Sequence, residues 1–234
     1  MIKVLSDVVD KYLSLPQFTI AIRRDATRNQ YAYLLRKLCE LQYKGKTVGS
    51  VAIDKLRPST CQDLYYLMIK QSQGEGVRGA NYTVQVAVRA WNVLIKHDLL
   101  DRNPWSLVER MQAAPRHTVW TNANFESILK TAFAERRWRN IGLLIRINAE
   151  LGQRAGDMRL VQWENFDLEQ QLYVRESIEK TREHIPGIPI SDNLKRMIID
   201  QKEYYAFQPW VVPNPNTMEP YTESGLRHTF RRLA

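Results

Sequence analysis

The strongest structural signal in this chain is Leu151-Gly152-Gln153-Arg154-Ala155-Gly156-Asp157-Met158-Arg159-Leu160-Val161-Gln162-Trp163. The residues before it, 141–151, are apolar on most sides, which predicts a buried helix. Glycine at position 152 ends such a helix readily, since glycine adopts the left-handed backbone conformation without steric cost. Arg154 and Asp157 follow at once on a short amphipathic turn. We therefore expect a charged turn directly after a buried helix.

Short β-branched and aromatic segments follow at residues 172–176 and 184–190, and they predict two strands. Two prolines in the second segment cannot donate to a sheet, so that strand should be irregular or lie at an edge. Ser191 is a suitable N-cap for another helix, and Thr121 for an earlier one. A last helix should begin near Thr222. The C-terminal half is thus expected to combine helices with a small antiparallel sheet.

The N-terminal half is predicted to be helical, because its apolar residues recur at three- and four-residue steps. Capping boxes at 27–30 and 58–62 predict the starts of two helices. A third helix is expected over roughly 81–97, after a flexible and partly basic turn at 73–79. Pro104 should end the helical run, since proline disfavours helix in the residue before it.

Residues 112–120 carry a proline and show no hydrophobic period, which is typical of an interdomain linker. We therefore expect a helical domain over 1–111, a linker over 112–120 and a second domain over 121–234. Limited proteolysis without a ligand should cut first within that linker.

The charge balance favours a polyanionic partner. Lysine and arginine number 34 against 25 acids, a formal charge of +9, which favours nucleic acid ahead of an anionic membrane surface. No run of about eighteen apolar residues occurs, which excludes a transmembrane helix. Cys39 and Cys61 are expected to be buried free thiols in a reducing cytoplasm. With so few cysteines and histidines, no metal site is expected.

The charged turn resembles the first catalytic box of the phage-integrase, or tyrosine recombinase, family. In that family Gly-x-Arg precedes an acid, a leucine and then Trp-x-x-Asp or Phe-Asp, as in residues 152–167 here. The resemblance implies that Arg154 binds a phosphate and that Asp157 supports it. The alternative is an arginine in an ordinary ion pair near a helix end. Lys180, 26 residues after Arg154 (180 − 154), stands where the family has a β-hairpin lysine, although a solvated lysine is the other interpretation.

The N-terminal half resembles the same family. Its matching motifs are Thr27 with Tyr31, Gly76 with Asn81 and Val84, and Asn103-Pro104-Trp105. The implied fold is mainly α, with a helical SAM-like core-binding domain followed by a partial α+β catalytic domain that bears a small antiparallel sheet. The two domains would clamp double-stranded DNA through its phosphates. The expected DNA contacts are Arg28, Lys37, Arg78, Asn81, Tyr82, Thr83, Arg89 and Arg227.

The implied activity is site-specific DNA recombination, most often the integration or excision of a phage or genomic island. A tyrosine attacks a DNA phosphodiester and forms a 3′-phosphotyrosyl link, with neither metal nor cofactor. The planar guanidinium of Arg154 suits the transition state, because it can meet two nonbridging oxygens at once. Lys180 would act as general acid toward the departing 5′-oxygen. The resemblance also implies self-association of the full-length protein on DNA, in the cytoplasm of a bacterial or phage-infected cell.

The C-terminal sequence admits two alignments with the family. Either 224–230 is the second catalytic box, with Ser224 in place of its histidine, or 221–226 begins the helix that precedes that box. Under both, Tyr204, Tyr205 and Tyr221 lie before the nucleophile position, so this chain alone is expected not to cleave DNA. Two rival hypotheses are a non-catalytic DNA-binding protein, such as a truncated integrase relic, and a basic helical protein-interaction adaptor.

Overall fold

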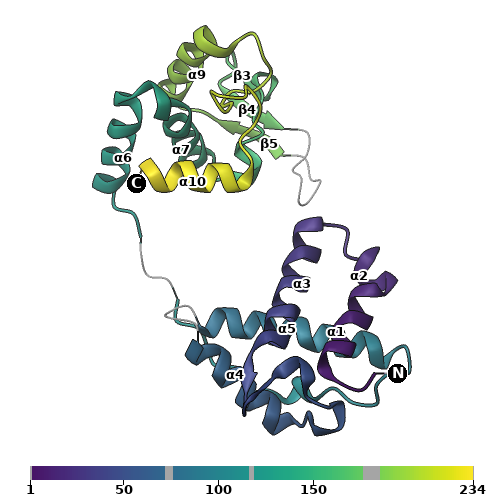
Figure 1. Ribbon diagram of the computed structural model, residues 1–234. Coiled ribbons are helices and arrows are strands. Elements are labelled where there is room, and N and C mark those ends of the chain that lie inside the picture. The colour runs from purple at the N-terminus through teal and green to yellow at the C-terminus, as the bar shows by residue number, and fades with distance from the viewer. Residues whose placement is uncertain (1, 72–75, 116–118, 176–184, 234) are drawn as a thin grey trace. The chain divides into compact units, whose positions relative to one another are not determined.

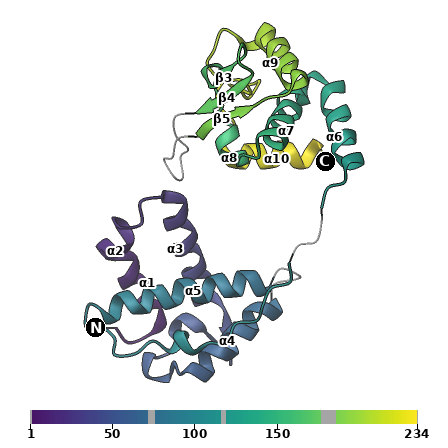
Figure 2. The same ribbon diagram turned by 180° about the vertical axis from the view of Figure 1, so that it is seen from behind.

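The computed structural model describes residues 2–71, 76–115, 119–175 and 185–233. It divides into two compact units, Met1–Arg116 and His117–Ala234, and each is described by itself. Figures 1 and 2 show helices in both units and a small sheet in the second.

The N-terminal unit is a bundle of helices around one hydrophobic core. Its α-helices are α1 (Leu5–Ser14), α2 (Pro16–Thr19), α3 (Asp25–Glu40), α4 (Pro58–Gln71) and α5 (Gly76–Ile95). Helix α5 packs against α1, α3 and α4 (Figures 1 and 2). It can do so because its apolar residues recur at helical spacing, and Val84, Ala87, Trp91 and Leu94 are all buried.

Short elements complete this unit. They are the strands β1 (Gln42–Tyr43) and β2 (Lys46–Thr47) and the 3-10 helices η1 (Val48–Ser50), η2 (Ile53–Lys55) and η3 (Pro104–Leu107). The antiparallel hairpin was not predicted, although Lys44 and Gly45 between its strands mark it, since both have positive φ, 50° and 78°. Asn103 caps η3 by accepting a hydrogen bond from the Trp105 amide, 3.1 Å away.

Three predicted helix starts were wrong. Helix α3 begins at Asp25 rather than behind Thr27, and the acid in its first turn suits the positive end of the helix dipole. Helix α4 begins at Pro58, because proline at the first helical position needs no amide partner. Helix α5 begins at Gly76, so 76–79, predicted as part of a flexible turn, are helical. The rest of that predicted turn lies outside the described residues.

The C-terminal unit combines helices with a small sheet. Its α-helices are α6 (Asn122–Ala134), α7 (Arg139–Leu151), α8 (Ala155–Met158), α9 (Asp192–Tyr205) and α10 (Glu223–Leu233). Its other elements are η4 (Arg136–Trp138), η5 (Trp163–Asn165), β3 (Phe166–Asp167), β4 (Leu172–Arg175) and β5 (Ile185–Pro189). The predicted mainly α fold with a small antiparallel sheet is confirmed.

The sheet has the antiparallel order β3-β4-β5, with Tyr173 opposite both Phe166 and Ile188. Strand β5 lies at its edge, as its prolines predicted. Thr121 and Ser191 are the N-caps of α6 and α9, and each accepts a backbone amide hydrogen bond at 3.2 Å, which confirms both predictions.

The core of this unit lies between α7, α9 and the sheet. Its members include Leu144, Ile147, Met158, Tyr173, Leu194, Ile198 and Val211. Helix α7 approaches α6 closely at Gly142, where an added Cβ would lie 2.8 Å from the Cβ of Ala132. Helix α10 packs against α6 and α7 and buries no residue fully.

Candidate nucleic-acid site

The turn that carries Arg154 is built by a glycine helix end. Helix α7 ends at Gly152, whose φ is 63° and whose amide donates to the Asn148 carbonyl at 3.0 Å. Arg154 then has extended backbone and is the N-cap of α8. Its side chain is exposed, whereas that of Asp157, one turn later, is only 4% exposed. An external anion can therefore reach the Arg154 guanidinium, whereas the Asp157 side chain lies beneath the surface.

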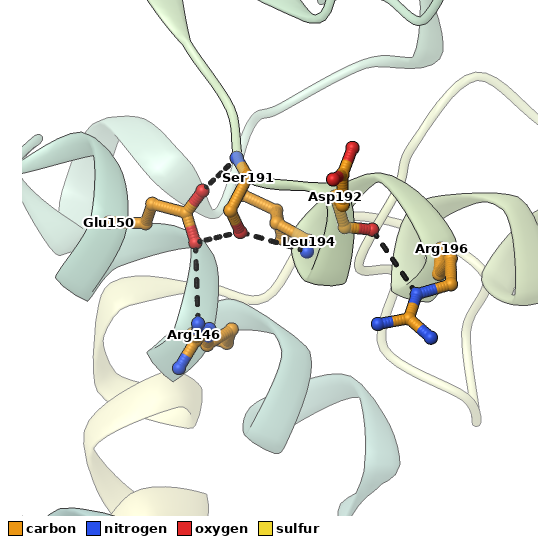
Figure 3. Close-up of polar contacts among 6 residues, drawn as sticks. All are labelled: Arg146, Glu150, Ser191, Asp192, Leu194 and Arg196. Atoms are coloured by element: carbon orange, nitrogen blue, oxygen red, sulfur yellow. Dashed lines mark hydrogen bonds and ion pairs between the residues drawn. The ribbon is translucent and has the colours of Figure 1, made fainter.

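A carboxylate network anchors the last turn of α7, directly before Gly152 (Figure 3). Glu150 accepts the Ser191 amide at 2.5 Å through Oε1 and the Ser191 hydroxyl at 3.0 Å through Oε2. Nη2 of Arg146 lies 3.6 Å from Glu150 Oε2. Because Ser191 also caps α9 through the Leu194 amide, this network joins α7 to the junction between β5 and α9.

A second bond holds the segment after α8. The Arg159 guanidinium donates from Nη1 to the backbone oxygen of Tyr221 at 3.1 Å, so this segment is tied to the residues before α10. Tyr221 is buried, and burial raises the pKa of its hydroxyl to about 12. Tyr204 is 46% exposed, and the Arg139 guanidinium lies 4.8 Å from its ring centroid. Tyr221 is thus shielded and hard to ionise, a poor arrangement for a nucleophile.

Lys180 and Arg227 were also predicted as site residues, and the structure describes only the second of them. Lys180 falls within 176–184, outside the described residues. Arg227 lies on α10 with an exposed side chain, and its Nη2 is 3.7 Å from Oε2 of Glu223, one helical turn earlier. Such a solvated pair holds Arg227 weakly and leaves it available to a stronger anion.

Among the residues expected to contact DNA in the N-terminal unit, Lys37 and Arg89 are exposed. Tyr82 is half-buried and meets Tyr31 edge to face, with ring centroids 6.0 Å apart. Arg28 is engaged within the chain, since it pairs with Asp25 and donates to the Ile22 carbonyl at 2.5 Å.

Three more of those residues bond to their own unit. The Thr83 hydroxyl is buried and donates to the Gly79 carbonyl at 3.0 Å. Arg78 donates to the Ala114 carbonyl at 2.7 Å, and the Asn81 amide donates to the Met111 carbonyl at 2.9 Å. These side chains hold the fold of the unit in the described structure.

A polar stripe along α5 was missed by the sequence reasoning apart from Arg89. Exposed residues recur at helical spacing and continue just past the helix end: Gln85, Arg89, Asn92 and Lys96. They line one wall of a groove of about 470 Å³, with Gln17 and Ala21 on the other. The spacing i, i+4, i+7, i+11 is the signal that could have found the stripe. Two of its members are cations on one face, which suits a phosphate backbone.

The described part of the chain holds no cluster of three or more histidine, cysteine, aspartate or glutamate residues suited to a metal ion. Of the helices that the structure describes, none has both the length and the apolar character needed to span a bilayer.

Comparison with known proteins places the fold. No family model and no curated protein matches the sequence. Among solved structures, Tn1549 transposon integrase bound to a circular intermediate DNA is similar with a TM-score of 0.75 at 14% identity, covering 99% of this chain and 77% of that one. A lambda integrase dimer bound to a COC′ core site gives a TM-score of 0.77 at 16% identity over 98% of this chain. The chain has the fold of these integrases.

The integrase fold extends over both units, since nearly the whole chain is covered in each comparison. A lambda integrase tetramer bound to a Holliday junction is also similar, with a TM-score of 0.76 at 16% identity over 98% of this chain. The chain spans 62% of the lambda integrase chain in the dimer and 65% in the tetramer.

Proposed function

We propose that this chain binds double-stranded DNA as the core-binding region and part of the catalytic region of an integrase-type tyrosine recombinase, acting in site-specific recombination. The observation that carries the proposal is Arg154, exposed directly after the glycine end of α7, within an integrase fold. The formal charge of +9 supports a polyanionic ligand.

In this proposal Arg154 binds the phosphate that reacts. A guanidinium offers a planar pair of donors that matches two nonbridging oxygens, and such preorganised donors contribute on the order of 3 kcal/mol each to transition-state binding. Asp157, buried beside this turn, supports the arginine. Lys180 serves as general acid toward the departing 5′-oxygen, and the reaction uses neither metal nor cofactor.

The N-terminal unit contributes phosphate contacts from its exposed cations. Lys37, Arg89 and Lys96 are exposed, and the last two share one groove. Tyr82, which is half-buried and lies on the same helix as Arg89, offers its hydroxyl as a further donor to phosphate. Four other predicted contacts shape this surface through hydrogen bonds within the unit: Arg28, Arg78, Asn81 and Thr83. They contact DNA only where a phosphate replaces the carbonyl that each one now binds.

Self-association on DNA and action in the cytoplasm of a bacterial or phage-infected cell belong to the same proposal. Its support is the fold shared with lambda integrase, whose solved forms include a dimer on a core site and a tetramer on a Holliday junction. The 234-residue chain should bind DNA without a covalent adduct, because Tyr204, Tyr205 and Tyr221 all lie before the position at which the family carries its nucleophile. Tyr221 is also buried, and its pKa is raised to about 12.

The test is the affinity for a random-sequence duplex as a function of salt. Roughly five to nine phosphate contacts, at about 0.9 each, predict a log–log slope of about −4 to −8. Arg154→Ala should weaken binding, and Arg154→Lys should recover only part of it because it loses the planar fork. Arg137→Ala, an exposed arginine beside Glu135, is the matched control and should have little effect.

A slope near zero would favour the protein-interaction adaptor over a DNA-binding protein. Normal binding with no effect of Arg154→Ala would favour a non-catalytic DNA-binding protein. An adduct trapped by the 234-residue chain on a nicked duplex would show that one of its tyrosines is the nucleophile.

A further inference from the structure

The segment 109–114, termed the strap here, is fastened along the N-terminal unit by side chains far away in sequence. Its first attachment is to Gln62 of α4. The Glu109 amide donates to Gln62 Oε1 at 2.8 Å, and Gln62 Nε2 donates back to the Glu109 carbonyl at 3.2 Å. One side-chain amide thus satisfies both backbone groups of a strap residue, as a neighbouring β-strand would.

The second attachment is a closed ring of three hydrogen bonds. The Tyr65 hydroxyl accepts the Met111 amide at 2.8 Å and donates to Asn81 Oδ1 at 2.8 Å. Nδ2 of Asn81 then donates to the Met111 carbonyl at 2.9 Å. Tyr65 is fully buried, so the ring is anchored in the core of the unit. A third attachment lies at the end of the strap, where Arg78 donates to the Ala114 carbonyl.

The connection between the two units is also fastened at its other end. Trp120 stacks on Phe230 of α10, with ring centroids 5.9 Å apart and an angle of 28° between the rings. Only residues 115–119 lie between the two fastened points. Part of the aperiodic, proline-bearing stretch 112–120 that looks like a free linker in sequence, its two ends, therefore belongs to segments held by specific contacts.

We infer that the strap shortens the connection between the units, and that Gln62, Tyr65 and Asn81 are positioning residues for joint binding of DNA by both units. This inference rests on the proposed function. When one unit is on DNA, the effective concentration of the other depends on the length of the chain that joins them. Releasing the strap lengthens that chain from 115–119 to 109–119, about twofold, and lowers the effective concentration about threefold by the −3/2 power law.

Docking of the strap is tested first, without DNA, by hydrogen exchange of single amides. The wild-type Glu109 and Met111 amides should be protected, since each donates to a side chain. Gln62→Ala should expose the former and Tyr65→Phe the latter. Gln71→Ala, at the end of the same helix, is the matched control and should change neither. Unprotected amides in the wild-type chain would overturn the inference.

Trypsin gives an independent readout, because Arg110 lies within the strap and its following peptide bond contains the Met111 amide. The double variant Gln62→Ala/Tyr65→Phe should be cut after Arg110 faster than the wild-type chain, with an unchanged far-UV spectrum. Equal cleavage rates in both chains would overturn the inference.

The consequence for DNA is measured with the same full chains and a random-sequence duplex of about 30 base pairs, roughly three helical turns. The triple variant Gln62→Ala/Tyr65→Phe/Arg78→Lys also removes the guanidinium that holds the Ala114 carbonyl, while it keeps the charge. It should bind about threefold more weakly with an unchanged salt slope, because it loses no cation. Inserting roughly six Gly and Ser residues after Ala114 leaves the strap docked and should cause a similar loss. Arg89→Ala, by contrast, should change the slope by about 0.9.

A released strap with unchanged DNA affinity would overturn this inference and leave the proposed function standing. A changed salt slope in the triple variant would also overturn it, because the strap would then be a phosphate contact. Absence of DNA binding by the wild-type chain would overturn the proposed function and this inference with it. Hydrogen exchange without DNA distinguishes that result from a strap that is not docked, because it reports on the Glu109 and Met111 amides alone.

Discussion

Gln201 and Asn140 form a hydrogen-bonded pair inside the C-terminal unit, with Nε2 of Gln201 donating to Oδ1 of Asn140 at 2.8 Å. Their side chains are 0% and 2% exposed. Gln201 also donates to the Val211 carbonyl and Asn140 to the Pro213 carbonyl, at 3.0 and 2.6 Å. The pair therefore holds the irregular segment 211–213 against α7 and α9, where no regular secondary structure could satisfy its carbonyls.

Replacing Gln201 by leucine should destabilise this unit strongly. The change leaves Asn140 Oδ1 and the Val211 carbonyl buried without a donor, and each such loss costs about 1–3 kcal/mol. We expect a decrease of about 2–4 kcal/mol in the free energy of unfolding, measured by urea denaturation. Gln170→Leu, in an exposed turn, is the control and should change it by less than about 0.5 kcal/mol. A small effect at Gln201 would mean that the pair is dispensable.

Much of the local structure could be predicted from the sequence, because its causes are local. The glycine end of α7, the serine and threonine caps and the edge position of β5 each depend on residues within one turn or one strand. The helix starts at Asp25 and Pro58 were missed for a related reason. Several residues there can begin a helix, and the capping-box pattern selected the wrong one.

The contacts that organise the candidate site are not local, and no sequence pattern marks them. Ser191 was predicted as a cap, but its bonds to Glu150 join residues 41 positions apart. Gln62 and Glu109 are 47 positions apart, so residues 109–111 looked like the end of a domain and 112–114 like free linker. The sequence also does not distinguish a basic residue that binds DNA from one that bonds within its own unit. Arg78 was predicted to contact DNA, but in the structure it donates to the Ala114 carbonyl.

Stability should fall as the pH rises above about 9. Burial raises the pKa of the Cys39 and Cys61 thiols from 9.0 to about 12, and that of Tyr221 from 10.0 to about 12. In this range the unfolded chain has released protons that the folded chain keeps, so alkali favours unfolding. Below pH 9 these groups are protonated in both states and contribute no pH dependence. Urea denaturation from pH 7 to 11 measures the effect.

The raised thiol pKa values also predict slow alkylation of the native chain. The thiolate is the reactive form, and it is scarce at pH 8 in both Cys39 and Cys61. Iodoacetamide should modify them only after denaturant is added, as followed by mass spectrometry. Cys61 is buried as predicted, whereas Cys39 is only half-buried, so the prediction of burial was wrong for Cys39. Rapid modification of the native chain would contradict the raised pKa of both thiols.

Gly152→Ala should destabilise the C-terminal unit through backbone conformation alone. The φ of Gly152 is 63°, which costs an alanine about 1–2 kcal/mol, while the space around its Cβ position is open. Gly156→Ala is the matched control, since its surroundings are equally open but its backbone is helical. That change should stabilise by up to about 1 kcal/mol. The unfolding temperatures of both variants test this explanation. Equal changes in unfolding temperature would show that the left-handed conformation of Gly152 has no special cost for alanine.

The Glu150–Ser191 contact should show strong coupling in a double-mutant cycle. Glu150→Ala removes the carboxylate that accepts both bonds, and Ser191→Ala removes the hydroxyl that also caps α9. Each single change should cost about 1–2 kcal/mol in the free energy of unfolding. The double variant should cost less than their sum by about 1 kcal/mol, because both changes break the same charge-assisted bond. Asp192→Ala with Glu150→Ala is the matched cycle, since Asp192 bonds instead to Gln171, and it should be additive within about 0.5 kcal/mol. Additivity in the Ser191 cycle would mean that the bond between the Ser191 hydroxyl and the Glu150 carboxylate does not couple α7 to α9, which would leave the bond from the Ser191 amide to Glu150 as the polar link between them.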